Sequence, residues 1–349
     1  MWYGLLFIKY MLNVVDFFSG CGGTSLGFEN VGFKIIGALD FDRDSAQTYK
    51  NNFPKAIFIQ ENIRNFKEEE LKIIIERSTG PLLFSGCAPC QPFSNQKKHT
   101  QKNDSRKSLL LEFLRFISFW KPEYIFLENV PGIQNISRSN GIFKKFTFQL
   151  EELGYKFEIG NIYASELGVP QKRKRFILIG CLKPYRLRSL QTIVNHYKHR
   201  QYTTREFIQD LPPIEAGETH EQIPNHVSSK LSKENIQRII LTPEGGDRRD
   251  WPEHLKNGCH KNYSGHTDVY GRMKWDALAA TLTTKCTSYS NGRFGHPEQN
   301  RAISVREAAR LQTFPDNFIF SGSITSCARQ VGNAVPPRMA ERISECFII

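Results

Sequence analysis

The chain has 349 residues, of which 40% are hydrophobic and 23% are charged, a composition typical of a folded globular protein large enough for two domains. Lys and Arg number 47 against 35 Asp and Glu, and the net charge of +12 indicates a polyanionic partner, most simply nucleic acid. Eight cysteines in so long a chain argue against a disulfide-rich scaffold, and the lack of a run of about 18 apolar residues argues against a membrane span.

The amino-terminal residues are apolar, but they do not have the features of a signal peptide. They lack a basic start and a small-residue cleavage site, and they run directly into a segment that the fold needs as a strand. Met11 is an alternative start, in which case residues 1–10 are an extension. Together with the scattered cysteines, this indicates a reducing, cytoplasmic setting.

A glycine-rich turn follows the first predicted strand, residues 12–18. The turn, residues 19–23, leads into a predicted helix, and a strand–turn–helix unit of this kind binds nucleotides. Its glycines allow positive φ and a close approach of a ligand to the backbone. Gly20 and Gly22 fit the dinucleotide fingerprint GxGxxG, but Ser25 takes the third position, so a dehydrogenase is possible but not favoured.

Asp40 lies directly after the second predicted strand, residues 33–39. A carboxylate at this position binds ribose hydroxyls in folds of this type. The alternative role is to cap the helix that follows, which Asp42 can also do.

Strands and helices alternate through the first half of the chain. Further strands are predicted at 56–59, 81–84, 123–127, 155–163 and 176–181, and helices at 25–30, 44–51, 67–77, 108–120 and 143–153. The alternation predicts an α/β fold with a Rossmann-like, doubly wound, mostly parallel sheet. Ligands bind such sheets beyond the carboxyl ends of the strands, where we expect Gly20–Gly23, Asp40, Asn62, Cys90 and Glu128.

The composition changes after about residue 183. Prolines, glycines, basic residues and aromatic residues interleave, and strands become hard to identify. We expect a catalytic domain made of residues 1–200 and 316–349, and a smaller, loop-rich domain at 201–315. Helices are predicted at 306–311 and 338–346, with a turn at 330–337 before the last helix.

Cys90 lies between Pro89 and Pro92, and the prolines restrict the backbone on both sides of it. A cysteine on a stiff turn after a strand is well placed to act as a nucleophile. With Cys87 it also forms a C-x-x-C pair, which alone is typical of a redox dithiol or half of a zinc site. No second pair of this kind accompanies it, so we expect no metal.

Three charged residues complete the candidate catalytic set. Glu128 follows the predicted strand 123–127 and is a candidate acid, and Arg173 and Arg175 can hold a substrate oxygen by charge-assisted hydrogen bonds. Taken singly, each has a plain alternative, as a salt-bridged carboxylate or part of a solvated basic turn. Their joint placement at strand ends favours one common site.

Six motifs follow one another along the chain. They are Asp16-Phe-Phe-Ser-Gly-Cys-Gly-Gly23, Pro89-Cys90-Gln91-Pro-Phe-Ser94, Glu128-Asn129-Val130, Gln171-Lys-Arg173-Lys-Arg175, Arg306-Glu307-Ala-Ala-Arg-Leu-Gln-Thr-Phe-Pro315 and Gln330-Val-Gly-Asn333-Ala-Val-Pro-Pro337. In order and spacing they resemble one family, the DNA cytosine-5 methyltransferases, from about residue 12 to the carboxyl terminus. One such motif is moderately specific, whereas six in order are very specific.

The resemblance implies an S-adenosylmethionine-dependent enzyme with S-adenosylhomocysteine as its product. Phe18 would pack on the adenine region, and Asp40 would take the ribose hydroxyls. In the family the position of Asn62 is often an aspartate, which predicts weaker but similar binding here, and that of Asp40 is often a glutamate. The residues implied to bind the cofactor are Phe18, Gly20, Gly22, Gly23, Asp40, Phe41, Asn62, Ile63, Pro89, Leu109 and Asn333.

The resemblance also implies a mechanism. Cys90 attacks C6 of cytosine, Glu128 contacts N3 and the 4-amino group, and Arg175 binds O2 with Arg173 close by. C5 then takes the methyl group, and loss of the C5 proton expels Cys90. The target base must first be flipped out of the duplex.

DNA contacts are expected from two places. Residues 95–107 form a long, polar, basic segment suited to close over phosphates, and residues 201–315 are the expected target-recognition region. The predicted DNA-binding residues are Gln91, Ser94, Lys97, Lys98, Arg106, Arg248, Arg249 and Arg293, with Tyr289 and Asn291 as further candidates for reading bases.

We therefore expect an active prokaryotic enzyme of the restriction-modification type, a monomer associated with the nucleoid. It would act on a specific duplex DNA sequence and work alongside a restriction endonuclease without a stable complex. One alternative is an RNA cytosine-5 methyltransferase, although the chain lacks the Cys-Phe-Thr stretch of the relative that acts on transfer RNA. Another is a non-catalytic DNA-binding relative, but Cys90 and Glu128 are both present.

Overall fold

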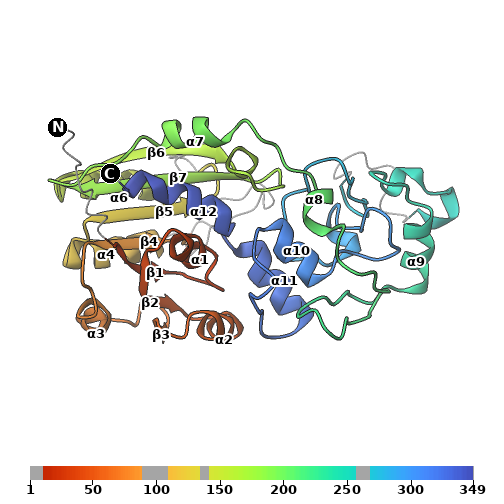
Figure 1. The fold of residues 1–349 in the computed structure, drawn as a ribbon, viewed down its shortest axis with the longest axis horizontal. Helices are drawn as coiled ribbons and strands as arrows, with labels where there is room; N and C mark the ends of the chain where they lie inside the picture. The colour runs from red at the N-terminus through yellow and green to blue at the C-terminus, as the bar shows by residue number, and fades with distance from the viewer. Residues whose placement is uncertain (1–10, 89–108, 134–140, 257–267, 349) are drawn as a thin grey trace, which may run out of the picture.

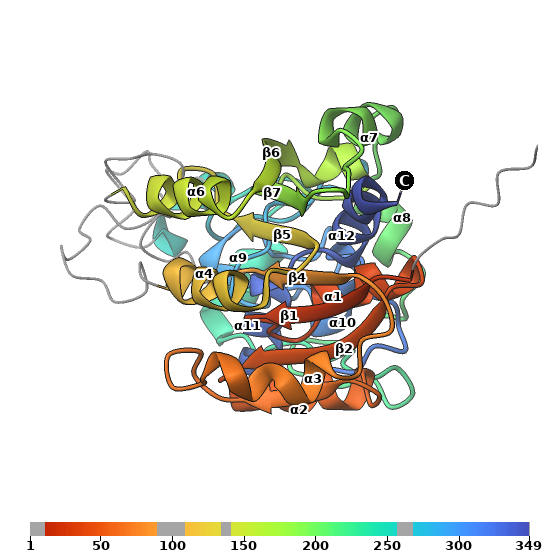
Figure 2. The same ribbon diagram turned by 90° about the vertical axis from the view of Figure 1, so that its left-hand side faces the viewer.

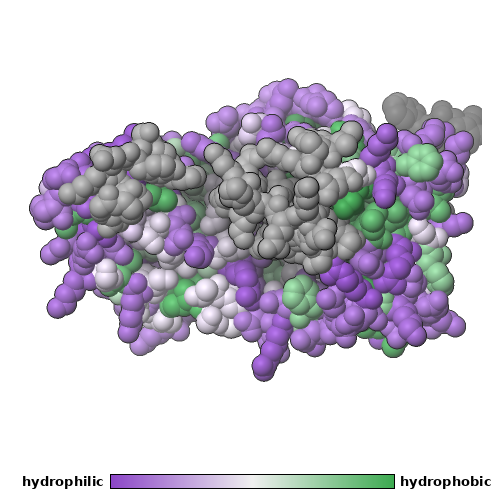
Figure 3. All heavy atoms as spheres, turned by 180° about the vertical axis from the view of Figure 1, so that it is seen from behind, coloured by the Kyte–Doolittle hydropathy of each residue, from purple (hydrophilic) through white to green (hydrophobic). Residues whose placement is uncertain are grey.

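The computed structural model describes residues 11–88, 109–133, 141–256 and 268–348. Figure 1 shows an elongated molecule with one half built on a sheet and another half in which loops and short helices predominate. Seen from behind, hydrophilic side chains cover most of the described surface, and hydrophobic ones are scattered among them (Figure 3). Among the described residues, no helix is both long enough and apolar enough to cross a membrane.

The described strands form one seven-stranded sheet. In spatial order they are β3 (Ile57–Gln60), β2 (Lys34–Asp40), β1 (Asn13–Phe17), β4 (Leu82–Gly86), β5 (Tyr124–Asn129), β7 (Lys174–Leu182) and β6 (Tyr155–Tyr163). The first five pair in parallel, whereas β7 is antiparallel to both β5 and β6. The predicted α/β fold with a mostly parallel sheet is confirmed. The strand order reverses at β1, and such a switch point is where these sheets bind ligands.

Helices cover both faces of the sheet (Figure 2). On one face lie α1 (Gly23–Asn30), α7 (Leu190–Tyr197) and α12 (Pro337–Ser344), and on the other lie α4 (Leu109–Trp120) and α6 (Ile142–Glu152). Beside β2 and β3 lie α2 (Arg43–Asn52) and the short α3 (Lys72–Ile75). The predicted helix at 67–77 is broken, because Glu68–Leu71 forms a 3₁₀ turn and only Lys72–Ile75 is α-helical.

A glycine brings the last helix, α12, tightly against the first. A Cβ on Gly27 of α1 would lie 2.3 Å from the Pro337 carbonyl oxygen and 2.7 Å from Ala340 Cβ. The next residue, Phe28, is fully buried, and its ring meets that of Phe126 in β5 edge to face at 5.4 Å between centroids. The carboxyl-terminal helix therefore belongs to the core of the sheet-bearing half, although the loop-rich half precedes it in the chain.

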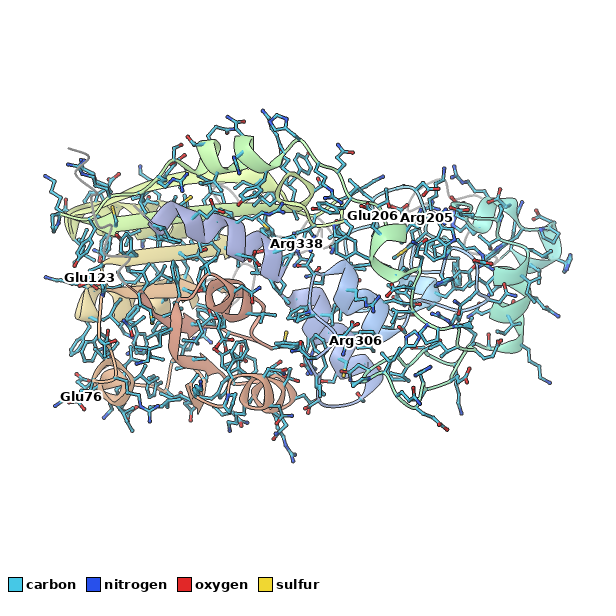
Figure 4. The ribbon with its side chains drawn as sticks, viewed as in Figure 1. Glu76, Glu123, Arg205, Glu206, Arg306 and Arg338 are labelled. Atoms are coloured by element: carbon cyan, nitrogen blue, oxygen red, sulfur yellow. The ribbon has the colours of Figure 1, made fainter. Side chains whose placement is uncertain are left out.

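Buried arginines stabilise the loop-rich half, whose described helices include α8 (Arg205–Ile208), α9 (Lys233–Ile240) and α10 (Val305–Leu311). Between residues 198 and 304 the described chain has isolated bridges but no strand of a sheet. Arg272 donates at 2.6–2.8 Å to the backbone carbonyls of Ile239, Thr242, His296 and Gln299. Arg306, where the two halves meet (Figure 4), donates to those of Pro224, Pro315 and Phe318. Carbonyls that a sheet would satisfy are satisfied here by guanidinium groups.

The turn predicted at 330–337 is wrong for its first four residues, which end helix α11 (Ile324–Asn333). The glycine in this stretch, Gly332, lies inside the helix and is required there for packing. A Cβ on Gly332 would lie 2.1 Å from the Thr283 carbonyl oxygen, so only glycine allows α11 to approach the loop-rich half this closely.

We predict that Gly27→Ala lowers the free energy of unfolding by about 1–3 kcal/mol, because the added methyl group forces α1 and α12 apart. Urea unfolding measures the change. Gly180→Ala is the matched control, since a Cβ there lies at least 3.5 Å from its neighbours, an ordinary contact distance. Equal stability of the two variants would contradict the close packing of these helices.

Candidate active site

The glycine-rich turn leaves the carboxyl end of β1 with an unusual backbone. Phe18, Gly20 and Gly22 all have positive φ, at 55°, 52° and 96°. A Cβ on Gly22 would lie 2.4 Å from a ring carbon of Phe53, so this position accepts only glycine. A Cβ on Gly20 would meet no atom within 4 Å, so the backbone there is open to a ligand.

The Asp40 carboxylate links the glycine-rich turn to the end of β2 by hydrogen bonds. Its two carboxylate oxygens accept hydrogen bonds from the backbone N–H groups of Gly20 and Asp42, both at 2.9 Å. Burial raises the pKa of Asp40, and these hydrogen bonds act in the opposite direction. Asp42 caps α2 by accepting from the Ser45 N–H at 2.9 Å, so the capping role considered for Asp40 belongs to its neighbour.

The groups around the turn fit S-adenosylmethionine. Ser19 Oγ is buried and has no hydrogen-bond partner among the described residues, so a polar ligand group there would satisfy it. Phe41 exposes 65% of its surface just after β2, where an apolar side chain can cover an adenine ring. Phe18 is half-buried in the turn itself.

Three further predicted cofactor residues follow β3 or begin α4. Asn62 is half-buried, and its Oδ1 accepts from the Arg64 N–H at 3.2 Å, which leaves a second lone pair for a ligand. Ile63 and Leu109 are 2% and 8% exposed and belong to the core between the sheet and α4. Their side chains therefore stabilise this edge of the sheet by packing in the hydrophobic core.

The end of α11 reaches the glycine-rich turn from the far end of the chain. A Cβ on Gly23 would lie 2.3 Å from the Val335 carbonyl oxygen, so the two segments are in direct contact. Asn333, the last residue of α11, is exposed and lies two residues before Val335. The contact places Asn333 close to the turn.

Arg173 stabilises the end of α11 by hydrogen bonds to backbone carbonyl groups. It is 1% exposed. Its guanidinium donates at 3.0–3.3 Å to the carbonyl oxygens of Leu282, Gly332 and Ala334. Two of these carbonyls flank Asn333. These contacts favour a structural role for Arg173, and the catalytic role assigned to it stays a prediction.

The antiparallel pairing of β7 with β5 sets Arg175 against Glu128. Glu128 pairs with Ile177 in the register, and Arg175 Nε lies 2.7 Å from Glu128 Oε1. The two side chains are 14% and 8% exposed, so the ion pair is largely shielded from water, which strengthens it. No hydrogen bond from another described residue reaches Glu128 Oε2. A carboxylate acceptor and a guanidinium donor thus lie side by side at the strand ends.

Cys90 and Pro89 lie outside the described residues, as do Gln91, Ser94, Lys97, Lys98 and Arg106. The chain leading to them is anchored beside Glu128, because Asn129 Nδ2 donates to the Ala88 carbonyl at 3.2 Å. The role of Asn129 in this hydrogen bond was not predicted from the sequence, although Asn129 follows Glu128 in the Glu128-Asn129-Val130 motif. Cys87 is half-buried, with Sγ 3.5 Å from Thr24 Oγ1 of α1.

The arginines predicted to contact DNA from the loop-rich half differ in exposure. Arg248 is 5% exposed. Arg293 has a side chain only 20% exposed, and it donates to the carbonyls of Gly245 and Gly246 at 2.7 and 2.8 Å. Arg249 is 66% exposed, and its Nε and Nη2 bind the two carboxylate oxygens of Asp247 at 2.8 and 2.7 Å. Of the three, Arg249 alone presents an exposed guanidinium held in one orientation.

The two other candidates for reading bases also differ. Tyr289 is 1% exposed, and its hydroxyl lies 2.8 Å from Thr242 Oγ1, so this side chain belongs to the core of the loop-rich half. Asn291 is exposed, and its Nδ2 donates to Ser288 Oγ at 2.7 Å. Asn291 is therefore the better placed of the two.

Comparison with known proteins gives a consistent result. The family model described as C-5 cytosine-specific DNA methylase matches residues 12–348. The Type II methylase M.HgiDII of Herpetosiphon aurantiacus is 37% identical over 340 residues, which cover 95% of this chain and 94% of that protein. The Type II methyltransferase M.DdeI of Desulfomicrobium norvegicum is 32% identical, with 96% and 88% covered.

Solved structures give the same picture. A putative DNA modification methyltransferase encoded within a prophage of E. coli has a TM-score of 0.76 and 26% identity, with 95% of this chain and 97% of that one covered. The Entamoeba histolytica methyltransferase EhMeth has a TM-score of 0.65 and 17% identity, with 97% and 98% covered. At that identity, the second likeness shows the fold alone.

We predict that Arg173→Met lowers the free energy of unfolding by about 3 kcal/mol, because it leaves buried carbonyls at the end of α11 unsatisfied. Urea unfolding measures the loss, and Lys172→Met, at the exposed neighbouring position, is the control. A variant as stable as the wild type that has lost methyl transfer would instead support the catalytic role.

Proposed function

The chain belongs to the C-5 cytosine-specific DNA methylase family, and from this premise we propose how its own residues methylate cytosine in DNA. S-adenosylmethionine, when bound, supplies a methyl group activated by its sulfonium. The proposal assigns the remaining tasks to the chain: holding the cofactor, activating C5 of the target base and selecting the DNA sequence.

The cofactor is held at the switch point of the sheet. Gly20 leaves room for it, Asp40 takes the ribose hydroxyls, and the Ser19 hydroxyl and Asn333 bind its polar end. Phe18 and Phe41 would pack on the adenine, and Asn62 would accept a hydrogen bond from its amino group. The remaining cofactor-binding residues are Phe18, Gly22, Gly23, Phe41, Ile63, Pro89 and Leu109.

Cys90 is the nucleophile. Attack of its thiolate on C6 of cytosine breaks the aromaticity of the ring and makes C5 electron-rich. The electron pair displaced by this attack moves toward N3, where Glu128 delivers a proton while it also contacts the 4-amino group, and Arg175 donates to O2. After C5 has taken the methyl group, loss of the C5 proton expels Cys90 and restores the ring.

The Glu128–Arg175 ion pair is the main observation that supports the roles proposed for these two residues. The pairing edge of cytosine presents the 4-amino donor at one end and the O2 acceptor at the other. A carboxylate oxygen beside a guanidinium, 2.7 Å apart on adjacent strands, offers the complementary acceptor and donor. Because the pair is formed before any base enters, binding costs little reorganisation.

DNA is bound by two parts of the chain. Lys97, Lys98 and Arg106 contact DNA phosphates, and Gln91 and Ser94 contact the flipped base; these residues lie outside the described part of the chain. Residues 201–315 act as the recognition domain, and residues 1–200 with 316–349 act as the catalytic domain. Arg249 is the preferred reader of a guanine, since the Asp247 carboxylate holds its guanidinium in place.

The biological setting follows from the relatives. Those named as Type II methylases and methyltransferases match nearly the whole chain, which supports a role in a restriction-modification system. We propose a monomer that acts on duplex DNA in the cytoplasm, on the nucleoid, and works alongside a restriction endonuclease without forming a stable complex.

We predict that the wild type transfers labelled methyl groups to duplex DNA but not to transfer RNA, and that Cys90→Ala abolishes transfer. Duplex DNA carrying 5-fluorocytosine traps the wild type in a complex that resists denaturation, because fluorine blocks the last elimination step. Glu128→Gln should slow trapping by about a hundredfold or more. Cys87→Ala is the matched control and keeps activity. Methylation by Cys90→Ala would overturn the assignment.

We predict that Arg249→Met relaxes discrimination at one base pair of the recognition sequence by about tenfold or more. Bisulfite sequencing of a methylated plasmid supplies the recognition sequence and measures the change. Arg205→Met is the matched control, since Arg205 makes the same two-point contact with Asp276, at 2.7 and 2.9 Å. Equal weakening at all sites would make Arg249 a phosphate contact instead.

A further inference from the structure

A carboxylate buried beneath the glycine-rich turn has no part in the chemistry proposed above. Asp16 lies in β1, the strand that leads into the turn, and is 0% exposed. Its Oδ2 accepts a hydrogen bond from Ser25 Oγ at 2.7 Å, and its Oδ1 accepts one from Ser85 Oγ at 2.8 Å. Both oxygens are thus used by hydroxyl groups from two different elements.

The first of these bonds closes the turn. Ser25 lies in the first turn of α1, so the bond from Ser25 to Asp16 joins the two ends of the loop that contains residues 18–23. Tyr49 of α2 supports the same closure. Its hydroxyl lies 2.7 Å from Ser25 Oγ, and two of its ring carbons lie 3.0 and 3.1 Å from a Cβ built on Gly22. Because Ser25 gives its proton to Asp16, Tyr49 donates to Ser25.

The second bond reaches the strand that leads to the nucleophile. Ser85 lies in β4, paired with Asp16 in the register, and the chain continues through Ala88 to the segment that holds Cys90. One carboxylate therefore contacts both the turn proposed to bind the cofactor and the strand that delivers the nucleophile. Other contacts between the two parts include the Thr24–Cys87 contact of 3.5 Å, the hydrogen bond from the Cys87 N–H to the Phe17 carbonyl at 3.3 Å and the pairing of β1 with β4.

Folding alone does not account for a carboxylate here. Burial raises the pKa of Asp16 to about 6, against the effect of its two serine partners, and the charge of Asp40 acts in the same direction as burial. A buried carboxylate disfavoured in this way destabilises the folded state at neutral pH, and an apolar side chain would avoid the penalty. Only a carboxylate, however, accepts from two hydroxyls at once on two separate oxygens.

We propose that Asp16 is a positioning residue that sets the cofactor-binding turn through Ser25 and the nucleophile strand through Ser85. The inference rests on the proposed function, because it needs the turn to bind S-adenosylmethionine and β4 to deliver Cys90. It assigns the two serines separable effects, one on cofactor affinity and one on the covalent step.

Two measurements separate these effects. Calorimetry gives the dissociation constant of S-adenosylhomocysteine in the absence of DNA, and trapping on 5-fluorocytosine DNA at saturating S-adenosylmethionine gives the rate of the covalent step. Ser25→Ala should weaken S-adenosylhomocysteine binding about tenfold and leave the trapping rate within about twofold of the wild type. Ser85→Ala should slow trapping about tenfold and leave the dissociation constant of S-adenosylhomocysteine within about twofold of the wild type. Asp16→Asn should impair both.

The matched control is Ser326→Ala, since Ser326 is also buried and its hydroxyl also donates to a carboxylate, that of Asp44. It should change neither constant. Tyr49→Phe, which removes only a hydroxyl, should weaken S-adenosylhomocysteine binding in the direction of Ser25→Ala. This milder variant tests the idea if the serine variants do not fold.

The proposal is overturned if Ser25→Ala and Ser85→Ala change the two constants in the same proportion, or if both lower only the melting temperature. A wild-type protein that neither methylates nor forms an adduct with DNA would instead refute the proposed function. An active wild type whose serine variants show no split would refute the role of Asp16 alone.

Discussion

The antiparallel pairing of β7 with β5 is the constraint on which the candidate active site depends. The parallel strands bring the turn after β1, the carboxylate after β2 and the chain leading to Cys90 to one edge of the sheet. A strand parallel to them would bring its end, and not its start, to this edge. The reversal of β7 places the start of that strand at this edge, and Arg175 meets Glu128 at 2.7 Å.

Several of the arginines that contribute to the positive charge of the chain are buried in the structure. A net charge of +12 indicates a surface for a polyanion. Yet Arg173, Arg301 and Arg306 are at most 1% exposed and donate to backbone carbonyls. Arg301 also forms a two-point ion pair with the buried Glu307, at 2.7 Å for each contact. Part of the cationic excess therefore stabilises loops, and the surface available to DNA is less basic than the total implies.

Much of the fold could be predicted, because hydrophobic strands and amphipathic helices alternate clearly up to residue 182. The α/β sheet and its strands follow from that pattern. Short helices such as α7, α9 and α11 were missed, since eight to ten residues with a glycine or several polar side chains give little periodicity. Gly332 shows the difficulty well: it is a packing requirement set by Thr283, a residue distant in sequence.

The order of the motifs assigns the chain to its family without a structure. A cysteine between prolines, a Glu-Asn-Val motif and a glycine-rich turn also restrict the reactions that the chain can perform. Tertiary contacts show which of two neighbouring arginines faces Glu128, which of three arginines stays exposed, and what Asp16 contacts. Local sequence patterns do not reveal these features, because burial and hydrogen-bond partners arise from residues far apart in the chain. Ser25 and Ser85 meet one carboxylate because α1 packs against β1 and β4 pairs with β1.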